Sequence, residues 1–173
     1  LAVASGPYGE ESIYGLATAS LPLPARLPGA DVLAQITRAI HSRRKLRVSY
    51  RSLSDRESQE ARILEPHALV DTGLRWHVRA YSDATYDFRD FVLSRFTQAE
   101  CLDEPAESSA EHDEDWVEMV NLQLAPHAGL DVAKRESLLL DYGASGEVIE
   151  VNVRRALIGY VLQRLSVDTT EDH

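Results

Sequence analysis

The chain has 173 residues and a formal net charge of -10, and 44% of its residues are hydrophobic and 27% charged. This composition is that of a folded globular protein and excludes a chain that is disordered throughout. No apolar run approaches the roughly 20 residues that a membrane helix needs. The single cysteine, Cys101, excludes an internal disulfide and favours a reducing compartment, so we expect a cytoplasmic protein without a membrane segment.

The charges are distributed unevenly along the chain. Residues 31–100 contain 12 Lys/Arg and 10 Asp/Glu, whereas residues 101–173 contain 5 Lys/Arg and 16 Asp/Glu. An anionic ligand would therefore be attracted only to the middle of the chain. We expect at least two units with different electrostatic roles.

The first 30 residues are predicted to form an extended, proline-rich arm. They carry no secretory signal, and they begin without Met, so we expect a fragment or a processed product. The stretch LPLPARLPG (21–29) contains three prolines, which exclude a helix. A helix follows, with Asp31 as its expected N-cap, because apolar residues recur at helical spacing through Ile40.

Short strands are predicted after this helix. LRVSYRS (46–52) alternates, RILEPHALVDTG (62–73) contains Pro66 and ends in a turn, LRWHVRAY (74–81) alternates most clearly, and FRDFVLSRFTQAE (88–100) returns as a further strand. A helix followed by several short strands predicts a small, strongly bent sheet or barrel.

The last third of the chain is predicted to form a second unit. DEPAESSAEHDED (103–115) has almost no apolar residues and indicates a solvated acidic linker. Residues 116–173 alternate between strand-like and helix-like segments in the order βαβα, which predicts a compact α+β module. Its final helix carries an apolar stripe from Leu157 to Leu165. Internal packing explains most of this stripe, and a dimer contact is the alternative.

One strand places several cations on the same face. The alternation of LRWHVRAY puts Arg75, His77, Arg79 and Tyr81 on one side. Guanidinium groups bind phosphate or carboxylate in a fixed fork geometry, and aromatic rings can stack on bases. Any one of these residues is explained by an ordinary solvated strand. The whole set favours an anion-binding site, together with basic residues of the neighbouring strands, Arg62, His67, Arg89 and Arg95.

Residues 31 to about 100 resemble the WYL-domain transcriptional regulators. The segments LRVSYRSLS, EARILEPHALVDTGLRWHVRAYS and FRDFVLSRF occur in the order of the family. The sequence Trp76-His77-Val78 stands where the family name spells Trp-Tyr-Leu, and histidine followed by Arg79 is similar to repressors that accompany phage-defence islands. Residues 116–173 resemble the C-terminal dimerisation extension of such proteins.

The resemblance implies a fold, a partner and a ligand site. The implied fold is an Sm-like, SH3-type β-barrel (WYL, 31–102) with a preceding helix, joined by the acidic linker (103–115) to the α+β dimerisation module. The implied effector is a nucleotide or a short nucleic acid, and the implied assembly is a homodimer. A winged helix-turn-helix precedes this region in relatives, and residues 1–30 supply none, so operator DNA is expected to be bound through an upstream domain or not at all. Carried over residue by residue, the ligand-binding candidates are Tyr50, Ser52, His67, His77, Arg79, Arg89 and Arg95, with Trp76 in support; for Tyr50 and Trp76, core packing is at least equally expected.

Two other classes of function are alternatives to this regulatory role. An enzyme would use His67 or His77 as a base and a nearby serine as nucleophile. The sequence has no Gly-x-Ser-x-Gly elbow, no phosphate-binding glycine-rich loop and no metal-ligand spacing, so we expect neither an enzyme nor a cofactor. A structural dimerisation module that contacts DNA directly is the other alternative, and the negative net charge opposes it.

Overall fold

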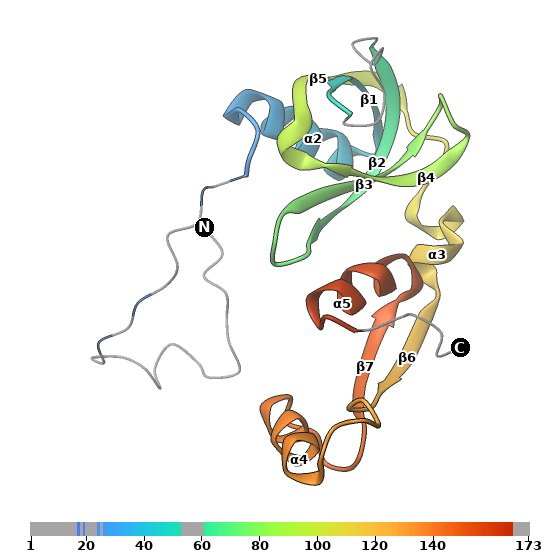
Figure 1. Cartoon of the computed structure of the whole chain (residues 1–173). Helices are drawn as coiled ribbons and strands as arrows, with labels where there is room; N and C mark the ends of the chain where they lie inside the picture. The colour runs from blue at the N-terminus through green and yellow to red at the C-terminus, as the bar shows by residue number, and fades with distance from the viewer. Residues whose placement is uncertain (1–16, 18, 20–23, 25, 53–60, 168–173) are drawn as a thin grey trace.

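The computed structural model describes residues 17, 19, 24, 26–52 and 61–167. The arm predicted for residues 1–30 lies mostly outside the described residues, as do the loop residues 53–60 and the tail residues 168–173. The described chain consists of a curved sheet with one helix, followed by a two-stranded ribbon with shorter helices (Figure 1). This is the α+β class that the sequence predicted. No helix among the described residues is both long and apolar enough to cross a lipid bilayer.

The helix before the sheet, α2, spans Ala30–Ser42 and packs on the sheet through Ile36 and Ala39, both of which are fully buried. Its N-cap is Gly29, not the predicted Asp31, which instead lies in the first turn. A carboxylate at that position still interacts favourably with the helix dipole. The helix ends at Arg43, whose φ of 53° is left-handed and turns the chain directly into the first strand.

Five antiparallel strands form the sheet of the first domain in the order β4-β3-β2-β1-β5. Their bounds are Arg44–Tyr50 for β1, Arg62–Asp71 for β2, Trp76–Ser82 for β3, Asp87–Val92 for β4 and Phe96–Pro105 for β5.

The sheet is strongly bent but open. Among the described strands, β4 and β5 are its two edges, so the closed barrel implied by the family resemblance is not observed. A single 3-10 turn, η1 (Leu93–Arg95), separates these strands and redirects the chain so that β5 pairs with β1. At this corner the backbone N–H of Val92 donates to the hydroxyl of Tyr50 at 3.0 Å. A side-chain hydroxyl thus satisfies the backbone donor at the end of β4.

The core lies between α2 and the concave side of the sheet. Alternate strand residues such as Leu46, Val48, Leu64 and Val78 are almost completely buried there, as the period of two requires. Trp76 packs against this core at its margin. Core packing was one of the two roles expected for this tryptophan, and its support of a ligand site stays a prediction.

The second unit follows β5 and is built from short elements. In chain order they are η2 (Ala110–His112), α3 (Glu114–Val117), β6 (Met119–Leu124), α4 (Val132–Asp141), β7 (Ile149–Arg154), η3 (Arg155–Leu157) and α5 (Ile158–Arg164).

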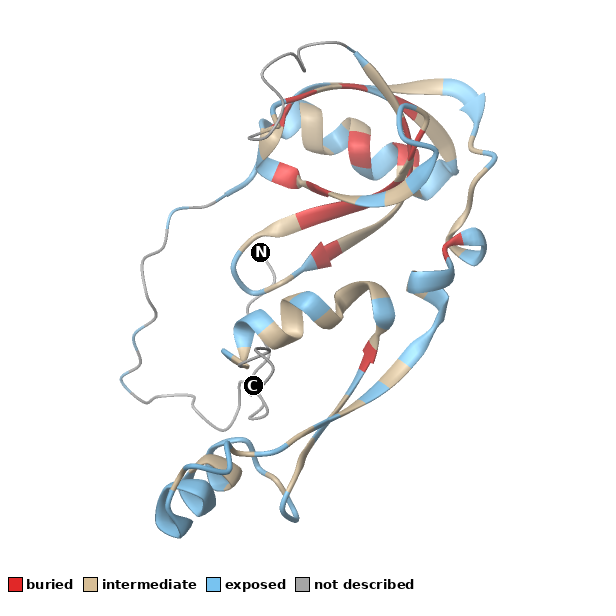
Figure 2. Cartoon of the chain, turned by 45° about the vertical axis from the view of Figure 1, so that its right-hand side comes forward, coloured by how far each residue is buried: buried red, intermediate tan, exposed pale blue. Residues whose placement is uncertain are grey.

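This second unit has little core of its own. Strands β6 and β7 form an antiparallel ribbon, and α4 lies at its far end, away from the first domain (Figure 1). Within residues 106–167, Val153 is the only buried hydrophobic side chain (Figure 2). Large apolar side chains such as Val132 and Leu140 are 68% and 80% exposed. The apolar stripe on α5 is also only half-buried. Helix α5 lies next to the first domain (Figure 1).

Candidate functional site

The polar face of β3 is directed toward the second unit. The pairing of β3 with β4 places Arg79 opposite Asp90, and Val78 opposite Phe91 on the core side. His77 and Arg79 share the polar face and are nevertheless only 6% exposed each. The alternation that the sequence predicted is present, but the face is covered by protein instead of solvent.

Arg79 is the centre of the cluster. Its Nε donates to Oδ2 of Asp113 at 2.7 Å, and its Nη2 donates to Oδ1 of the same carboxylate at 2.8 Å. Its Nη1 donates to Oδ1 of Asp90 at 3.4 Å. The paired contact with Asp113 is the bidentate geometry that guanidinium groups form with carboxylates and phosphates. The sequence placed Asp113 in a solvated linker, whereas its carboxylate is 2% exposed and joins the second unit to β3.

His67 reaches the same carboxylate from β2. The register of β2 and β3 shifts between Pro66 and Ala68, so His67 is the extra residue of a β-bulge. A bulge redirects a side chain relative to the regular alternation of its strand. The His67 Nε2 lies 3.0 Å from Oδ2 of Asp113. Because the ionised carboxylate only accepts, the imidazole proton is on Nε2, and the buried Nδ1 has no hydrogen-bond partner among the described residues.

A second set of contacts joins β3 and β4 to α5. The hydroxyl of Tyr160 donates to Oδ2 of Asp90 at 2.8 Å. The Tyr160 ring also lies on the His77 ring, with centroids 4.9 Å apart. Asp90 therefore receives hydrogen bonds from both Arg79 and Tyr160, and links the cation to the last helix of the second unit.

Trp116 completes the joint on the α3 side. Asp113 is the N-cap of α3, and its Oδ1 accepts from the backbone N–H of Trp116 at 3.2 Å. The Trp116 ring meets the His67 ring edge-on at 5.3 Å, and the guanidinium of Arg154 lies 4.5 Å from its centre. Arg154 also donates to the carbonyl oxygen of Trp116 at 2.6 Å. These contacts connect the polar face of β3 through α3 to strand β7.

The protonation states follow from burial and neighbouring charge. Burial lowers the pKa of His67 and of His77, and for His77 the nearby Arg75 and Arg95 lower it further. Burial would raise the pKa of Asp113, but the hydrogen bonds from Arg79 and His67 outweigh it and lower the pKa below the ordinary value. The joint at neutral pH therefore contains an ionised carboxylate, a guanidinium and neutral imidazoles.

The structure divides the candidate ligand-binding residues into groups. It brings His67, His77 and Arg79 together at the joint. Arg95 lies in η1, half-buried, and its charge acts on His77. Its guanidinium makes no ion pair with the described residues.

The other candidates lie apart from this group. Tyr50 is 7% exposed and packs edge-on against Phe91 and Phe96 in the core. Arg89 pairs in register with Ala80, which places it on the sheet face opposite to that of Arg79. Ser52 is half-buried, two residues beyond the end of β1.

Sequence reasoning missed the residues that complete the joint. Asp113 precedes the acidic first turn of α3, which is a typical N-cap pattern and could have indicated an ordered residue within the acidic run. Tyr160 is half-buried on α5, and a phenol that is partly removed from water usually has a hydrogen-bond partner. The identity of that partner, Asp90, depends on tertiary contacts alone.

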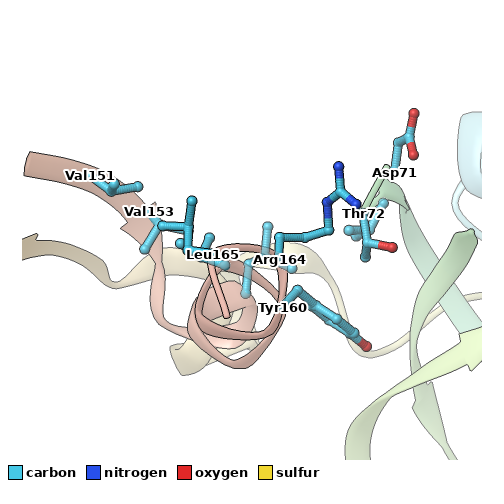
Figure 3. A pocket seen from close by; sticks show the side chains of 10 residues that line it. Asp71, Thr72, Val151, Val153, Tyr160, Arg164 and Leu165 are labelled. Atoms are coloured by element: carbon cyan, nitrogen blue, oxygen red, sulfur yellow. The ribbon is translucent and has the colours of Figure 1, made fainter. Parts of the chain in front are cut away.

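An apolar groove borders the joint. It has a volume of about 300 Å³ and lies between the end of β2 and the β7–α5 corner (Figure 3). Val70 of the first domain and Val153 of the second unit both line it. Arg164 reaches from α5 toward Thr72 (Figure 3). The Arg164 guanidinium lies close to Gly73, where a Cβ atom would be 3.4 Å from Nε. Both units thus contribute walls to the same groove.

Two family models match the chain. The WYL domain matches residues 31–101, and the BrxR transcriptional regulator, C-terminal dimerization domain, matches residues 119–173. The joint described above lies between these two matched regions and includes Asp113, which falls in neither of them.

Curated relatives match over most of the chain. A protein of Pseudomonas aeruginosa named "DNA-binding transcriptional repressor CapW" is 39% identical over 162 residues, which are 94% of the chain and 54% of that relative. A protein of the same name from Escherichia coli (strain KTE188) is 37% identical over 155 residues, or 90% of the chain and 51% of the relative. The chain thus spans about half the length of the curated relatives it matches. Among solved structures, proteasome accessory factor B/C (PafBC) of Arthrobacter aurescens is 23% identical, with a TM-score of 0.42 over 87% of this chain and 24% of that one.

Proposed function

The chain belongs to the WYL-domain family, because it carries a WYL domain followed by a BrxR-type C-terminal dimerization domain. We propose that it is the effector-sensing and dimerising region of a bacterial transcriptional repressor. The relatives named as DNA-binding repressors support this proposal. Binding of operator DNA is assigned to parts of the protein outside these two domains. A cytoplasmic location, where the free cysteine stays reduced, belongs to the same proposal.

The effector in this proposal is a nucleotide or a short nucleic acid with at least one phosphate. The observation that carries it is the convergence of His67, His77 and Arg79 from neighbouring strands in a chain whose net charge is -10. Arg95 adds a guanidinium without an ion-pair partner among the described residues, and its charge contributes to the lowered pKa of His77. Such a group is available for a ligand phosphate without loss of an existing contact.

The remaining candidates have secondary roles in the proposal. Tyr50 supports the corner between β4 and β5 through its contact with Val92. Ser52 and Arg89 would contact only a ligand that extends beyond the joint, since Arg89 lies on the other face of the sheet.

A ligand at this place is suited to influence dimer geometry. The joint connects the strand that carries Arg79 to α3 and α5, which flank the ribbon of the dimerization domain. A ligand that binds one arrangement of the two domains more tightly than the other shifts the equilibrium between them. In a homodimer this shift would alter the spacing of the attached DNA-binding domains.

Binding measurements with the purified chain test the effector. We expect binding of short single-stranded oligodeoxynucleotides or cyclic nucleotides, and a loss of about tenfold or more in Arg95→Ala. Arg47→Ala is the matched control, because Arg47 forms an exposed pair with Glu100 on the β1–β5 side of the sheet. If no such compound binds, or if Arg95→Ala and Arg79→Ala bind as the wild type does, the proposed site is wrong.

Further measurements on the same chain separate the alternatives. A strongly salt-dependent affinity of the chain for duplex DNA would favour the direct DNA-binding module. Hydrolysis of a nucleotide that disappears in His77→Ala would favour an enzyme. Light scattering of the chain should give the mass of a dimer, and a monomer at micromolar concentration would contradict the dimerising role.

A further inference from the structure

The donors that an effector would need on Arg79 are already occupied by the same chain. Its Nε and Nη2 point to the two oxygens of Asp113 at 2.7 and 2.8 Å. Asp113 and Arg79 are 2% and 6% exposed, so water does not weaken this pair as it weakens a surface pair. An incoming phosphate cannot form the same bidentate contact while the Asp113 carboxylate remains in place.

We propose that Asp113 is an internal substitute for the effector, and that an anionic group of the ligand displaces its carboxylate from Arg79 and thereby releases the start of α3. This inference rests on the proposed function and assigns a regulatory mechanism to the same site. The exchange replaces one anion by another beside Arg79, so the guanidinium is not left buried without a partner. Displacement therefore avoids the penalty of an unpaired buried charge.

Asp113 is suited to transmit its own displacement. The carboxylate that binds Arg79 and His67 is also the N-cap of α3, through the backbone N–H of Trp116. Strand β6 begins at Met119, directly after this short helix. Movement of Asp113 thus removes the cap of α3 and its attachment to the WYL domain together.

The other contacts of the joint determine where the movement goes. Trp116 is held by Arg154 of β7 on one side and packs on His67 on the other. Loss of the Asp113 contacts leaves Trp116 with a hydrogen bond and a cation–π contact to Arg154 of β7, and with only a ring contact to His67 of the WYL domain. Asp90 meanwhile keeps Arg79 positioned, because it binds Nη1 and is itself held by Tyr160. One carboxylate is therefore exchangeable and the other maintains the receptor.

The exchange is also consistent with the charges around α3. Glu114 and Asp115, the next two residues, are exposed, and Asp115 pairs with Arg155 at the surface. A released Asp113 would join carboxylates that are already in water, where their repulsion is screened by salt. The released state is therefore accessible to the folded protein.

Substitution of the displaced group gives the first test. Asp113→Asn keeps an oxygen that can cap α3 but removes the charge that competes for Arg79. We expect inorganic pyrophosphate and a short oligothymidylate to bind Asp113→Asn about tenfold more tightly than wild type. Asp115→Asn, the same chemical change two residues further along, should bind them as wild type does.

Hydrogen exchange of the unaltered chain gives a second test that does not depend on the folding of a variant. Saturation with the probe should increase the exchange of the α3 backbone amides, including that of Trp116, by about tenfold or more, because their cap and anchor are lost. Exchange in α4, at the far end of the ribbon, should not change.

The outcomes distinguish this inference from the function on which it rests. Binding by wild type with equal affinity in Asp113→Asn, and with α3 exchange unchanged, would overturn the displacement and leave the effector site standing. Absence of binding by both wild type and Asp113→Asn would overturn the effector site as well. Binding by Asp113→Asn alone would support displacement and show that the internal carboxylate holds the site closed.

Discussion

Replacement of Asp113 by alanine should lower the free energy of unfolding by about 3–5 kcal/mol, the usual cost of removing one partner from a buried ion pair. The carboxylate accepts from Arg79 at 2.7 and 2.8 Å, pairs with His67 at 3.0 Å and accepts from the Trp116 amide at 3.2 Å. Loss of the N-cap alone contributes about 1 kcal/mol of this cost. The larger part arises because Arg79, 6% exposed, keeps only the longer contact to Asp90.

A second arginine–aspartate pair provides the control. Arg44 donates to Asp103 at the same distance of 2.8 Å, but the two side chains are 44% and 104% exposed. Asp103→Ala should therefore leave the unfolding midpoint nearly unchanged, since exposed pairs contribute little. The two pairs share the residue types and a contact distance of 2.8 Å, but Asp113 is buried and has the additional contacts to His67 and to the Trp116 amide.

Urea unfolding followed by tryptophan fluorescence measures both variants. Trp116 lies in the joint and Trp76 lies at the margin of the WYL core, so single-tryptophan forms would separate undocking of α3 from unfolding of the sheet. Equal midpoints for Asp113→Ala and Asp103→Ala would refute the reasoning. Hydrogen exchange of the α3 amides in Asp113→Ala at the wild-type rate would also refute it.

Other changes at the joint have defined consequences. Burial lowers the pKa of His77, so around pH 6.5 the imidazole takes up a proton more readily in the unfolded chain than in the folded chain. The free energy of unfolding should therefore fall as the pH is lowered from about 7.5 to about 5.5. His77→Phe should reduce that fall in urea titrations. Tyr160→Phe keeps the ring but removes the 2.8 Å hydrogen bond to Asp90, and calorimetry should show a loss of about 1–2 kcal/mol. Gly73 has a φ of +76°, so Gly73→Ala should cost about 1 kcal/mol in urea unfolding, whereas Gly146→Ala, at a site with nothing within 4 Å and no positive φ, should be nearly neutral.

The elements that depend on local pattern were predictable. The alternation of LRWHVRAY set His77 and Arg79 on one side of β3, and the register with β4 agrees with it. The helix before the sheet was also expected, although its cap was assigned to Asp31 instead of Gly29. Helix ends are harder to predict than helix interiors, because capping depends on one or two residues and not on a repeated pattern.

The elements that depend on pairing at long range were not predictable. Closure of the sheet was implied by the family resemblance, but η1 directs β5 to β1 and leaves an open sheet among the described strands. The position of Arg89 on the opposite face follows from its register with Ala80, which no spacing within β4 reveals. The sequence pattern locates a side chain on a strand, whereas the neighbouring strand determines which groups it meets.

From the sequence alone came the class of fold, the division of charge between the two halves and the basic character of one strand face, because these depend on composition and on the period of two. The tertiary structure decided that this face is covered by protein. Asp113, 34 residues further along the chain, binds Arg79, and Tyr160 of α5 binds Asp90. A run of carboxylates is most stable in water unless a buried cation offers a better partner. The acidic segment 103–115 looked solvated for that reason, and only the folded chain places Arg79 within reach of one of its members.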